Sequence, residues 1–233
     1  MTRIRVRDAV ALAAALLYAL LWIGWVAGWG WLHSFDQALL NPPHAYGVEH
    51  PGWVHGWNVF STVFGPEVLR GLVLVLIVVE LIRRNYRPAV FLLLTAGGSA
   101  LVTEVAKTLA DRPRPETRLV EAHGMSFPSG HAVGDLVIVG GLLVAYLPVI
   151  APRWWTLVIA LGAAVVVMIG VSRVVLNVHN PSDVLAGWSL GYLYLLACVR
   201  WYPPRPALEA AVAAAPGTVT PAAGTPPAPD TST

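Results

Sequence analysis

Residues 154–200 read WWTLVIALGAAVVVMIGVSRVVLNVHNPSDVLAGWSLGYLYLLACVR. Two apolar runs, 154–171 and 183–200, flank a short segment that holds charged and polar side chains. An α-helix of roughly 17–25 apolar residues crosses the ~30 Å hydrocarbon core of a bilayer. A helix also satisfies its own backbone hydrogen bonds, which hydrocarbon cannot do. The stretch therefore predicts two membrane-spanning helices joined by a polar turn.

Four further apolar runs of similar length precede this stretch, at 9–29, 66–82, 88–110 and 131–150. Of the 233 residues, 56% are hydrophobic and 12% are charged, whereas soluble domains carry about 25% charged residues. The sequence thus predicts an all-α fold, a six-span transmembrane helical bundle over residues 1–202. Residues 203–233 are rich in Pro, Ala and Thr and poor in large apolar side chains, so we expect a disordered cytoplasmic tail there.

The distribution of charge indicates the orientation of the bundle. With a net charge of only +2, the chain lacks the strongly basic surface that nucleic-acid binding requires. Arginines gather at the N-terminus, in the second and fourth connections and after the last run, and basic residues favour cytoplasmic loops. We therefore expect a multi-pass plasma-membrane protein with both termini in the cytoplasm. The first apolar run is expected to be a retained signal anchor.

The third connection departs from this charge rule. It should lie outside, yet it holds Arg112, Arg114 and Arg118, and Lys107, the lone lysine of the chain, stands at its edge. Positive charge here indicates either an anionic ligand or a solvated loop balanced by its own acidic residues. Arginine can grip a phosphate through two parallel hydrogen bonds, and lysine acts as a point charge. The alternative for each single cation is snorkelling to the membrane interface.

Ser129, Gly130 and His131 mark the start of the fourth apolar run. Ser129 is a good N-cap, and Gly130 lets a ligand approach the backbone closely. The start of a helix presents free N–H groups and attracts anions. His131 then lies in the first turn, where it could act as a general acid toward a leaving oxygen.

The last apolar run has a similar start. Asn180 can cap the helix, and Pro181 suits its first position. His179 lies just before the helix, and Asp183 lies in its first turn. We expect an imidazole and a carboxylate within hydrogen-bond reach, so that the carboxylate keeps one ring nitrogen protonated and leaves the other free to attack. The simpler alternative is a carboxylate that merely stabilises the helix start.

Together these segments resemble the signature of the type 2 phosphatidic acid phosphatase superfamily, also called lipid phosphate phosphatases. That signature reads Lys-x6-Arg-Pro, Pro-Ser-Gly-His and Ser-Arg-x5-His-x3-Asp. Every position is matched here, by Lys107, Arg114, Pro115, Pro128, Ser129, Gly130, His131, Ser172, Arg173, His179 and Asp183. The likeness covers about 105–185 by motif and the rest of the chain by span count. Three motifs in the right order make it highly specific.

The resemblance implies a role for each matched residue. His179 would be the nucleophile that forms a phosphohistidine, Asp183 its orienting acid, and His131 the acid that protonates the leaving group. The phosphate would be held by Lys107, Arg114, Ser129, Gly130 and Arg173. The resemblance implies no metal and no cofactor. The family also includes soluble vanadium haloperoxidases, a branch that six membrane spans argue against.

Two carboxylates near the motifs carry further hypotheses. Glu104 lies one turn before Lys107, and we expect the two to form a structural pair. Asp135 lies four residues after His131 on the same helical face. It is expected either to keep His131 protonated or to make a polar contact between helices.

Other polar residues outside the signature are harder to assign. Arg112 is expected to be a surface charge or an auxiliary phosphate contact, and His123 could reach the head group. The first outer connection holds four histidines, His33, His44, His50 and His55. Their irregular spacing argues against a metal site. Given Trp53, Trp57 and Phe60, an amphipathic lid on the membrane surface is the better interpretation.

The resemblance leaves the substrate open. Phosphatidic acid, phosphatidylglycerophosphate and a polyprenyl (undecaprenyl) pyrophosphate all carry a terminal phosphate on a lipid, so the expected partner is a membrane lipid phosphate in the bilayer. An alternative within the enzymes is a transferase that passes the phosphoryl group to an acceptor other than water. A non-enzymatic lipid-binding or transport protein would lack signature residues, and none is missing. Nothing in the sequence indicates the oligomeric state.

Overall fold

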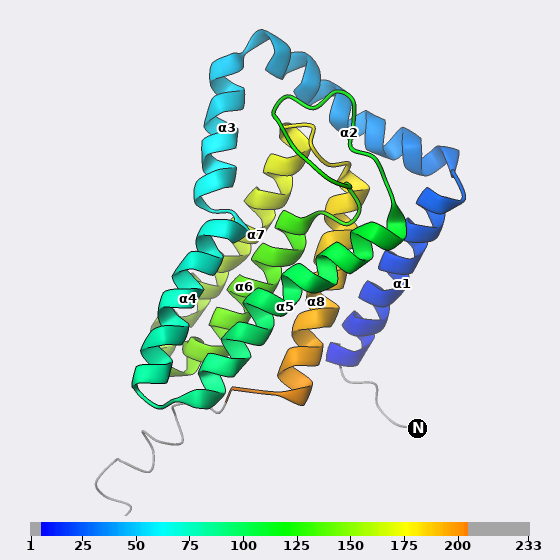
Figure 1. The fold of residues 1–233 in the computed structure, drawn as a ribbon. Coiled ribbons are helices and arrows are strands. Elements are labelled where there is room, and N and C mark those ends of the chain that lie inside the picture. The colour runs from blue at the N-terminus through cyan, green and yellow to red at the C-terminus, as the bar shows by residue number, and fades with distance from the viewer. Residues whose placement is uncertain (1–5, 205–233) are drawn as a thin grey trace, which may run out of the picture.

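The computed structural model describes residues 6–204, and within that range it is helical with no strand (Figure 1). Six segments are long and apolar enough to cross a membrane: Val6–Val26, Pro51–Ile82, Tyr86–Ala110, Gly130–Val149, Pro152–Val175 and Pro181–Trp201. The predicted all-α fold with six candidate spans is confirmed. The predicted tail lies outside the described residues from residue 205 onward.

The helices follow one another with short connections, except for one longer loop at 111–129. Their bounds are α1 Val6–Val26, α2 Gly30–Glu49, α3 Pro51–Val63, α4 Pro66–Ile82, α5 Tyr86–Ala110, α6 Gly130–Tyr146, η1 Leu147–Val149, η2 Pro152–Trp154, α7 Trp155–Val175 and α8 Pro181–Trp201. They agree with the predicted runs to within a few residues. The larger difference is in α7, which continues past residue 171 to Val175 and so carries Arg173 in its last turn.

The first connection is helical, and it differs from the predicted lid. α2 crosses the end of the bundle, whereas α3 continues in line with α4 (Figure 1). Trp53, Trp57 and Phe60 therefore lie along α3, where their rings meet edge to face at interplanar angles of 79° and 85°. Extended backbone at Gly65 and the missing N–H of Pro66 separate α3 from α4. These aromatic residues belong to an extension of a span, and it is α2 that covers the bundle.

α6 lies at the centre of the bundle, in contact with α4, α5, α7 and α8. Two glycines allow α8 to approach it closely. A Cβ atom at Gly187 would lie 2.8 Å from the carbonyl oxygen of Ser129, and one at Gly191 would lie 3.2 Å from that of Val133. The absence of side chains therefore brings the N-terminal halves of α6 and α8 together.

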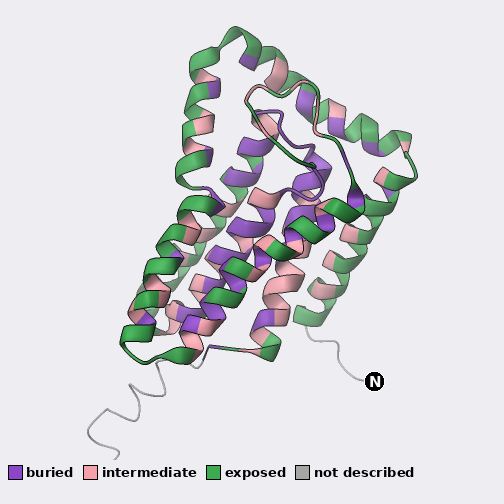
Figure 2. Ribbon diagram, viewed as in Figure 1, coloured by how far each residue is buried: buried purple, intermediate pink, exposed green. Residues whose placement is uncertain are grey.

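The ends of four helices meet at one end of the bundle, which we call the site end. There α5 and α7 finish, α6 and α8 begin, and the loop 111–129 crosses between them (Figure 1). Buried residues gather in this region and along α6, while the outward faces of α1, α3 and α4 are exposed (Figure 2). Many of the exposed side chains are large and apolar, as expected of helices that contact lipid.

Candidate active site

The turn between α7 and α8 is held in one conformation by its backbone and by one asparagine. The carbonyl of Arg173 accepts a hydrogen bond from the N–H of His179 at 3.3 Å. Asn177 has a φ of 54°, a left-handed conformation that asparagine tolerates. Its side chain donates to the carbonyl of Leu40 in α2 at 3.2 Å and accepts from the hydroxyl of Thr117 at 2.9 Å. The turn that carries His179 is thus tied to both α2 and the loop 111–129.

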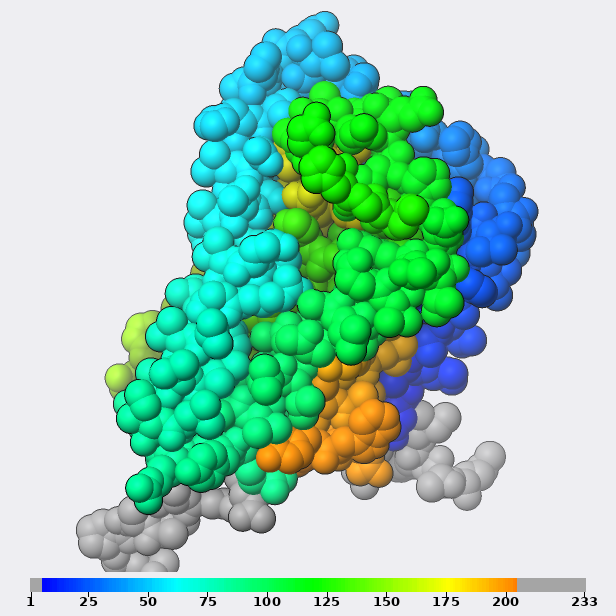
Figure 3. Space-filling model, in the orientation of Figure 1, coloured from blue at the N-terminus to red at the C-terminus, as the bar shows by residue number. Residues whose placement is uncertain are grey.

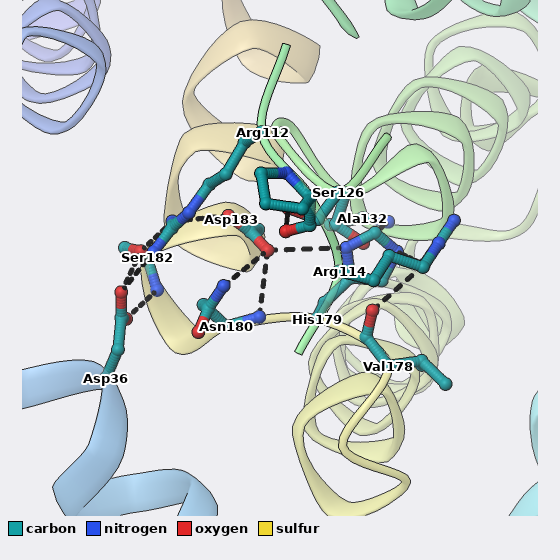
Figure 4. A network of polar contacts seen from close by, with 12 residues as sticks. Asp36, Arg112, Arg114, Ser126, Ala132, Val178, His179, Asn180, Ser182 and Asp183 are labelled. Carbon is teal, nitrogen blue, oxygen red and sulfur yellow. Dashed lines mark hydrogen bonds and ion pairs between the residues drawn. The ribbon is translucent and has the colours of Figure 1, made fainter. Parts of the chain in front are cut away.

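The start of α8 brings His179 and Asp183 together. Pro181 occupies the first turn, and Asn180 forms a capping box with Asp183, whose Oδ2 accepts from the N–H of Asn180 at 2.8 Å. The same Oδ2 lies 3.5 Å from Nδ1 of His179 (Figure 4). This distance is at the long limit of a hydrogen bond, and catalytic hydrogen bonds often tighten only when substrate binds. Both side chains are buried.

The protonation state of His179 follows from its other neighbour. Its Nε2 lies 3.0 Å from Nη1 of Arg114, and a guanidinium can only donate. Nε2 must therefore be unprotonated, which leaves the ring proton on Nδ1, facing Asp183. Burial lowers the pKa of His179 to about 4, although Asp183 acts in the opposite direction. The ring is thus neutral at neutral pH, with a lone pair on the nitrogen that faces Arg114.

Arg114 is held by backbone carbonyls as well as by His179. Its Nε and Nη2 donate to the carbonyl of His123 at 3.1 and 2.9 Å, and its Nη1 donates to the carbonyl of Val178 at 2.9 Å. His123, predicted to reach a head group, contributes this carbonyl, and its side chain is exposed. Because Arg114 contacts the lone pair of Nε2, this nitrogen can bond to another group only after Arg114 releases it.

Arg112 is buried and forms ion pairs with two carboxylates. It donates to Oδ1 of Asp183 at 2.6 Å and to Oδ2 of Asp36 at 2.8 Å (Figure 4). Its guanidinium also lies 4.8 Å from the ring of Trp25. The backbone N–H and the hydroxyl of Ser182 both donate to Asp36, at 2.9 and 2.7 Å. The prediction of a surface charge at Arg112 is therefore wrong, because the side chain is buried and two buried carboxylates compensate its charge.

Asp36 lies outside every motif, so its role could not be predicted from local spacing. It lies in α2 and is 1% exposed, at a distance of 146 residues along the chain from Ser182. A continuous series of contacts leads from Asp36 through Arg112 and Asp183 to His179. We call these four residues the buried relay. An unpaired buried charge is costly, so each member restricts the position of the next.

His131 stands at the start of α6, where a glutamate approaches it. Its Nε2 lies 3.9 Å from Oε2 of Glu67, which belongs to the first turn of α4. Asp135, the predicted partner, is a fully buried residue of α6. Neither of its carboxylate oxygens has a hydrogen-bond partner within residues 6–204. The predicted contact between Asp135 and His131 is absent from this part of the chain. Glu67 occupies that place.

A cavity of about 200 Å³ opens at the site end between α4, α5 and α6. Five of the predicted site residues line it: Lys107, Arg114, Gly130, His131 and His179. The remaining lining residues are Pro66, Glu67, Arg70, Ala100, Thr103 and Glu104. Figure 3 shows the hollow between α3 and α4 on one side and α5 on the other. The cavity thus opens sideways, between two candidate spans.

Lys107 has the neighbours that the sequence suggested. Its Nζ donates to Oε1 of Glu104 at 3.3 Å, so the predicted pair is confirmed. A Cβ atom at Gly130 would lie 3.6 Å from this ammonium group. Glycine at this position therefore leaves the space beside Lys107 open for a ligand.

Two predicted phosphate-binding residues do not line the cavity. Ser129 is fully buried, and its hydroxyl accepts from the N–H of Ala132 at 3.5 Å, which confirms it as the N-cap of α6. Arg173 is 8% exposed, and its Nη1 donates to the hydroxyl of Ser61 in α3 at 2.5 Å. Ser61 lies in another helix and in no motif, so local spacing could not predict this contact.

Comparison with known proteins places the chain in a family. The family model described as the PAP2 superfamily matches residues 88–207. Phosphatidylglycerophosphatase B of Bacillus subtilis is 36% identical over 106 residues, which cover 44% of this chain and 52% of that protein. Undecaprenyl-diphosphatase of Sulfolobus acidocaldarius is 30% identical over 145 residues, which cover 59% of this chain and 66% of that protein. The chain therefore spans about half the length of the first relative and just under two thirds of the second.

A solved structure shares the fold. The crystal structure described as the first transmembrane PAP2 type phosphatidylglycerolphosphate phosphatase, from Bacillus subtilis, superposes with a TM-score of 0.70 at 24% identity. The match covers 82% of this chain and 94% of that chain. With six apolar helices and this transmembrane neighbour, the protein is a multi-pass membrane protein. Because the family model matches more than half of its residues, the chain belongs to the PAP2 superfamily.

Proposed function

We propose that the protein is a membrane lipid phosphate phosphatase. It hydrolyses the terminal phosphate of a lipid phosphate or lipid diphosphate through a phosphohistidine intermediate. The observation that carries this proposal is the state of His179, a neutral imidazole whose unprotonated Nε2 adjoins a cavity lined by Lys107, Arg114 and His131. Such a nucleophile, combined with cations and a second histidine, suits phosphoryl transfer.

In the first step, the substrate phosphate takes the hydrogen bond that Arg114 gives to Nε2 of His179. Nε2 then attacks phosphorus and forms the N–P bond, while the P–O bond to the lipid breaks and His131 gives its proton to the leaving oxygen. In the second step, water attacks the phosphohistidine and gives a proton to His131. The N–P bond breaks, and inorganic phosphate leaves. Asp183 holds the Nδ1 proton and stabilises the positive ring that forms.

The position of the cavity suits a substrate that stays in the membrane. Ala100 and Thr103 continue the lining from Lys107 along α5, between the helices. A head group can enter between α4 and α5 while its tails remain in the leaflet. The names of both relatives refer to lipid phosphates, which supports a substrate of this class. Phosphatidic acid, phosphatidylglycerophosphate and a polyprenyl diphosphate are the candidate substrates.

We further propose that the site end faces the outside of the plasma membrane and that both termini are cytoplasmic. Arg83, Arg84 and Arg153 lie in connections at the end opposite the site end, and basic residues in short loops favour the cytoplasmic side. Labelling of Glu121→Cys by an impermeant maleimide on intact cells, and protection of Arg83→Cys, would support this orientation. The reverse pattern would contradict it.

The experiment for the activity is phosphate release in detergent with a chelator present. Phosphatidic acid, phosphatidylglycerophosphate and a polyprenyl diphosphate are assayed separately. We expect His179→Ala to lose at least about a thousandfold in kcat. His55→Ala, a change at an exposed histidine in α3, is expected to keep the activity. Release that persists in His179→Ala would contradict the mechanism, and label transferred to a second lipid would indicate a transferase.

A further inference from the structure

We propose that Arg70 forms a subsite for a second phosphate group of the substrate. This inference rests on the proposed function and narrows its substrate class. It selects lipids that carry another phosphate between the reacting terminal phosphate and the tail. Two kinds of lipid have this chemistry, a lipid diphosphate and a lipid whose two phosphates are bridged by a small polyol.

Arg70 occupies a position where a charged side chain is energetically unfavourable. It lies in the second turn of α4, within the candidate span Pro51–Ile82, and it lines the cavity. An ionisable side chain inside a membrane span is costly, and such residues commonly face a functional cavity. The signature of the family does not include this position, so the motifs leave the charge unexplained.

The contacts of Arg70 leave much of its hydrogen-bonding capacity free. Its Nη1 lies 3.7 Å from Oε1 of Glu67, whose side chain is 70% exposed, and its Nε donates to the carbonyl of Ala96 at 3.3 Å. Exposed ion pairs of this kind contribute little. Arg112, in contrast, contacts buried carboxylates at 2.6 and 2.8 Å. An anion that enters the cavity can therefore replace Glu67 as the partner of Arg70.

The depth of Arg70 matches the order of groups in such a lipid. A Cβ atom at Gly130 would lie 3.6 Å from Nζ of Lys107, and one at Gly134 would lie 3.1 Å from Nη2 of Arg70. Gly134 is one helical turn, about 6 Å, further into the bundle along α6. The reacting phosphate is the outermost group of the lipid, and the second phosphate lies on its tail side. The second cation thus stands where the second phosphate would be.

The competing explanation is that Arg70 only compensates the charge of Asp135. Asp135 lies one residue beyond Gly134 in the interior of α6. No ion pair or hydrogen bond joins Asp135 to Arg70 among residues 6–204, whereas Arg70 lines the cavity and Asp135 does not. Loss of a structural counter-ion would impair every substrate equally, so substrate preference distinguishes the two explanations.

The test compares Arg70→Gln with the wild-type protein on three lipids in detergent. We expect kcat/KM to fall about ten- to a hundredfold, mainly through KM, for both phosphatidylglycerophosphate and a polyprenyl diphosphate. For phosphatidic acid, which has a single phosphate, the change should stay below about twofold. Arg70→Lys should recover part of the loss. Arg87→Gln, at the opposite end of α5, is the matched control and should behave as wild type.

An equal loss on all three lipids, or no loss on any, would overturn the proposal. A loss on one of the two-phosphate lipids alone would support it and identify the source of the second phosphate. Binding gives a readout that does not depend on turnover. Arg70→Gln should weaken the affinity for inorganic pyrophosphate about tenfold and leave that for orthophosphate unchanged. Equal pyrophosphate affinities would overturn the subsite, whereas a wild-type protein that is inert toward all lipids would contradict the proposed function instead.

Discussion

The two sides of the candidate nucleophile hold their charges in different ways. On the buried side, Arg112 contacts Asp183 and Asp36 at 2.6 and 2.8 Å, and all three side chains are less than a tenth exposed. On the cavity side, Lys107 and Arg70 meet their glutamates at 3.3 and 3.7 Å, and these glutamates are 71% and 70% exposed. The same kinds of residue are thus locked on one side and loosely paired on the other.

This difference indicates two separate tasks. A buried charge without a partner is strongly destabilising, so the relay behind His179 has one favourable arrangement before any substrate arrives. Water screens the exposed pairs, and their carboxylates can be exchanged for phosphate at little cost. We infer that the buried relay positions the nucleophile and that the cavity cations bind the substrate. Four predictions test this division, from the largest expected effect to the smallest.

Arg112→Met should cause the largest change. It leaves Asp36 and Asp183 buried without their cation, and the removal of one partner from a buried ion pair costs about 3–5 kcal/mol. Thermal unfolding in detergent should therefore begin at a clearly lower temperature, and phosphate release should be lost. Arg118→Met, an exposed change in the same loop, is the control and should match wild type. If both variants unfold at the same temperature as the wild-type protein, the ion pairs of Arg112 do not stabilise the buried side.

The ring of His179 should titrate far below an ordinary histidine. Burial lowers its pKa to about 4, so protonation of Nε2, which removes the attacking lone pair, occurs only as the pH falls through about 4. Between pH 5 and 7 the nucleophile stays neutral and available. NMR titration of ring-labelled protein measures this midpoint, and His179→Gln assigns the signal. A midpoint near 6.5 would mean that water reaches the His179 ring from the side of the buried relay.

Asp36→Asn should reduce the rate more than the binding. The amide keeps the shape of the side chain, but Arg112 is then neutralised by Asp183 alone, which loosens the support of His179. We expect kcat to fall roughly tenfold, with KM within about twofold because the cavity cations are untouched. Steady-state kinetics on the best lipid provides the measurement. A rise in KM at constant kcat would assign Asp36 to substrate binding.

The smallest effects are expected for Glu67 and Glu104, two glutamates of similar exposure. Glu67→Gln removes the carboxylate that stands 3.9 Å from His131, and we expect kcat to fall roughly two- to threefold. Glu104→Gln frees Lys107 from its partner, so KM should fall by up to about twofold with kcat unchanged. If both changes altered kcat and KM in the same way, the residues on the cavity side would influence the reaction only through their total charge.

Local patterns predicted the spans and most of the helix starts correctly. The number of apolar residues in a run is a property of the sequence, and it decides whether a helix can cross a bilayer. The caps at Ser129 and Asn180 and the pair of Glu104 with Lys107 also involve close neighbours along the chain. The proposed nucleophile and its carboxylate were predictable for the same reason, since one helical turn separates them.

The predictions that failed depend on how the helices face one another. Arg112 looked like a surface charge because its two carboxylate partners lie 76 and 71 residues away. Asp135 looked like the partner of His131 because both share a face of α6, but the packing of α4 brings Glu67 there instead. Rotation and depth of one helix against another are not encoded in any local spacing.

The sequence by itself determined that this protein is a six-span helical membrane protein with a histidine, its carboxylate and several cations at one end of the bundle. The length of an apolar run and the capping of a helix depend only on residues that are close together in the sequence. They are therefore the same wherever the other segments of the chain lie. Only the tertiary structure decided which cations are locked and which are free. It buried Arg112 between two carboxylates and set Arg70 beside the cavity, because the energy of a charge depends on the groups and the water around it.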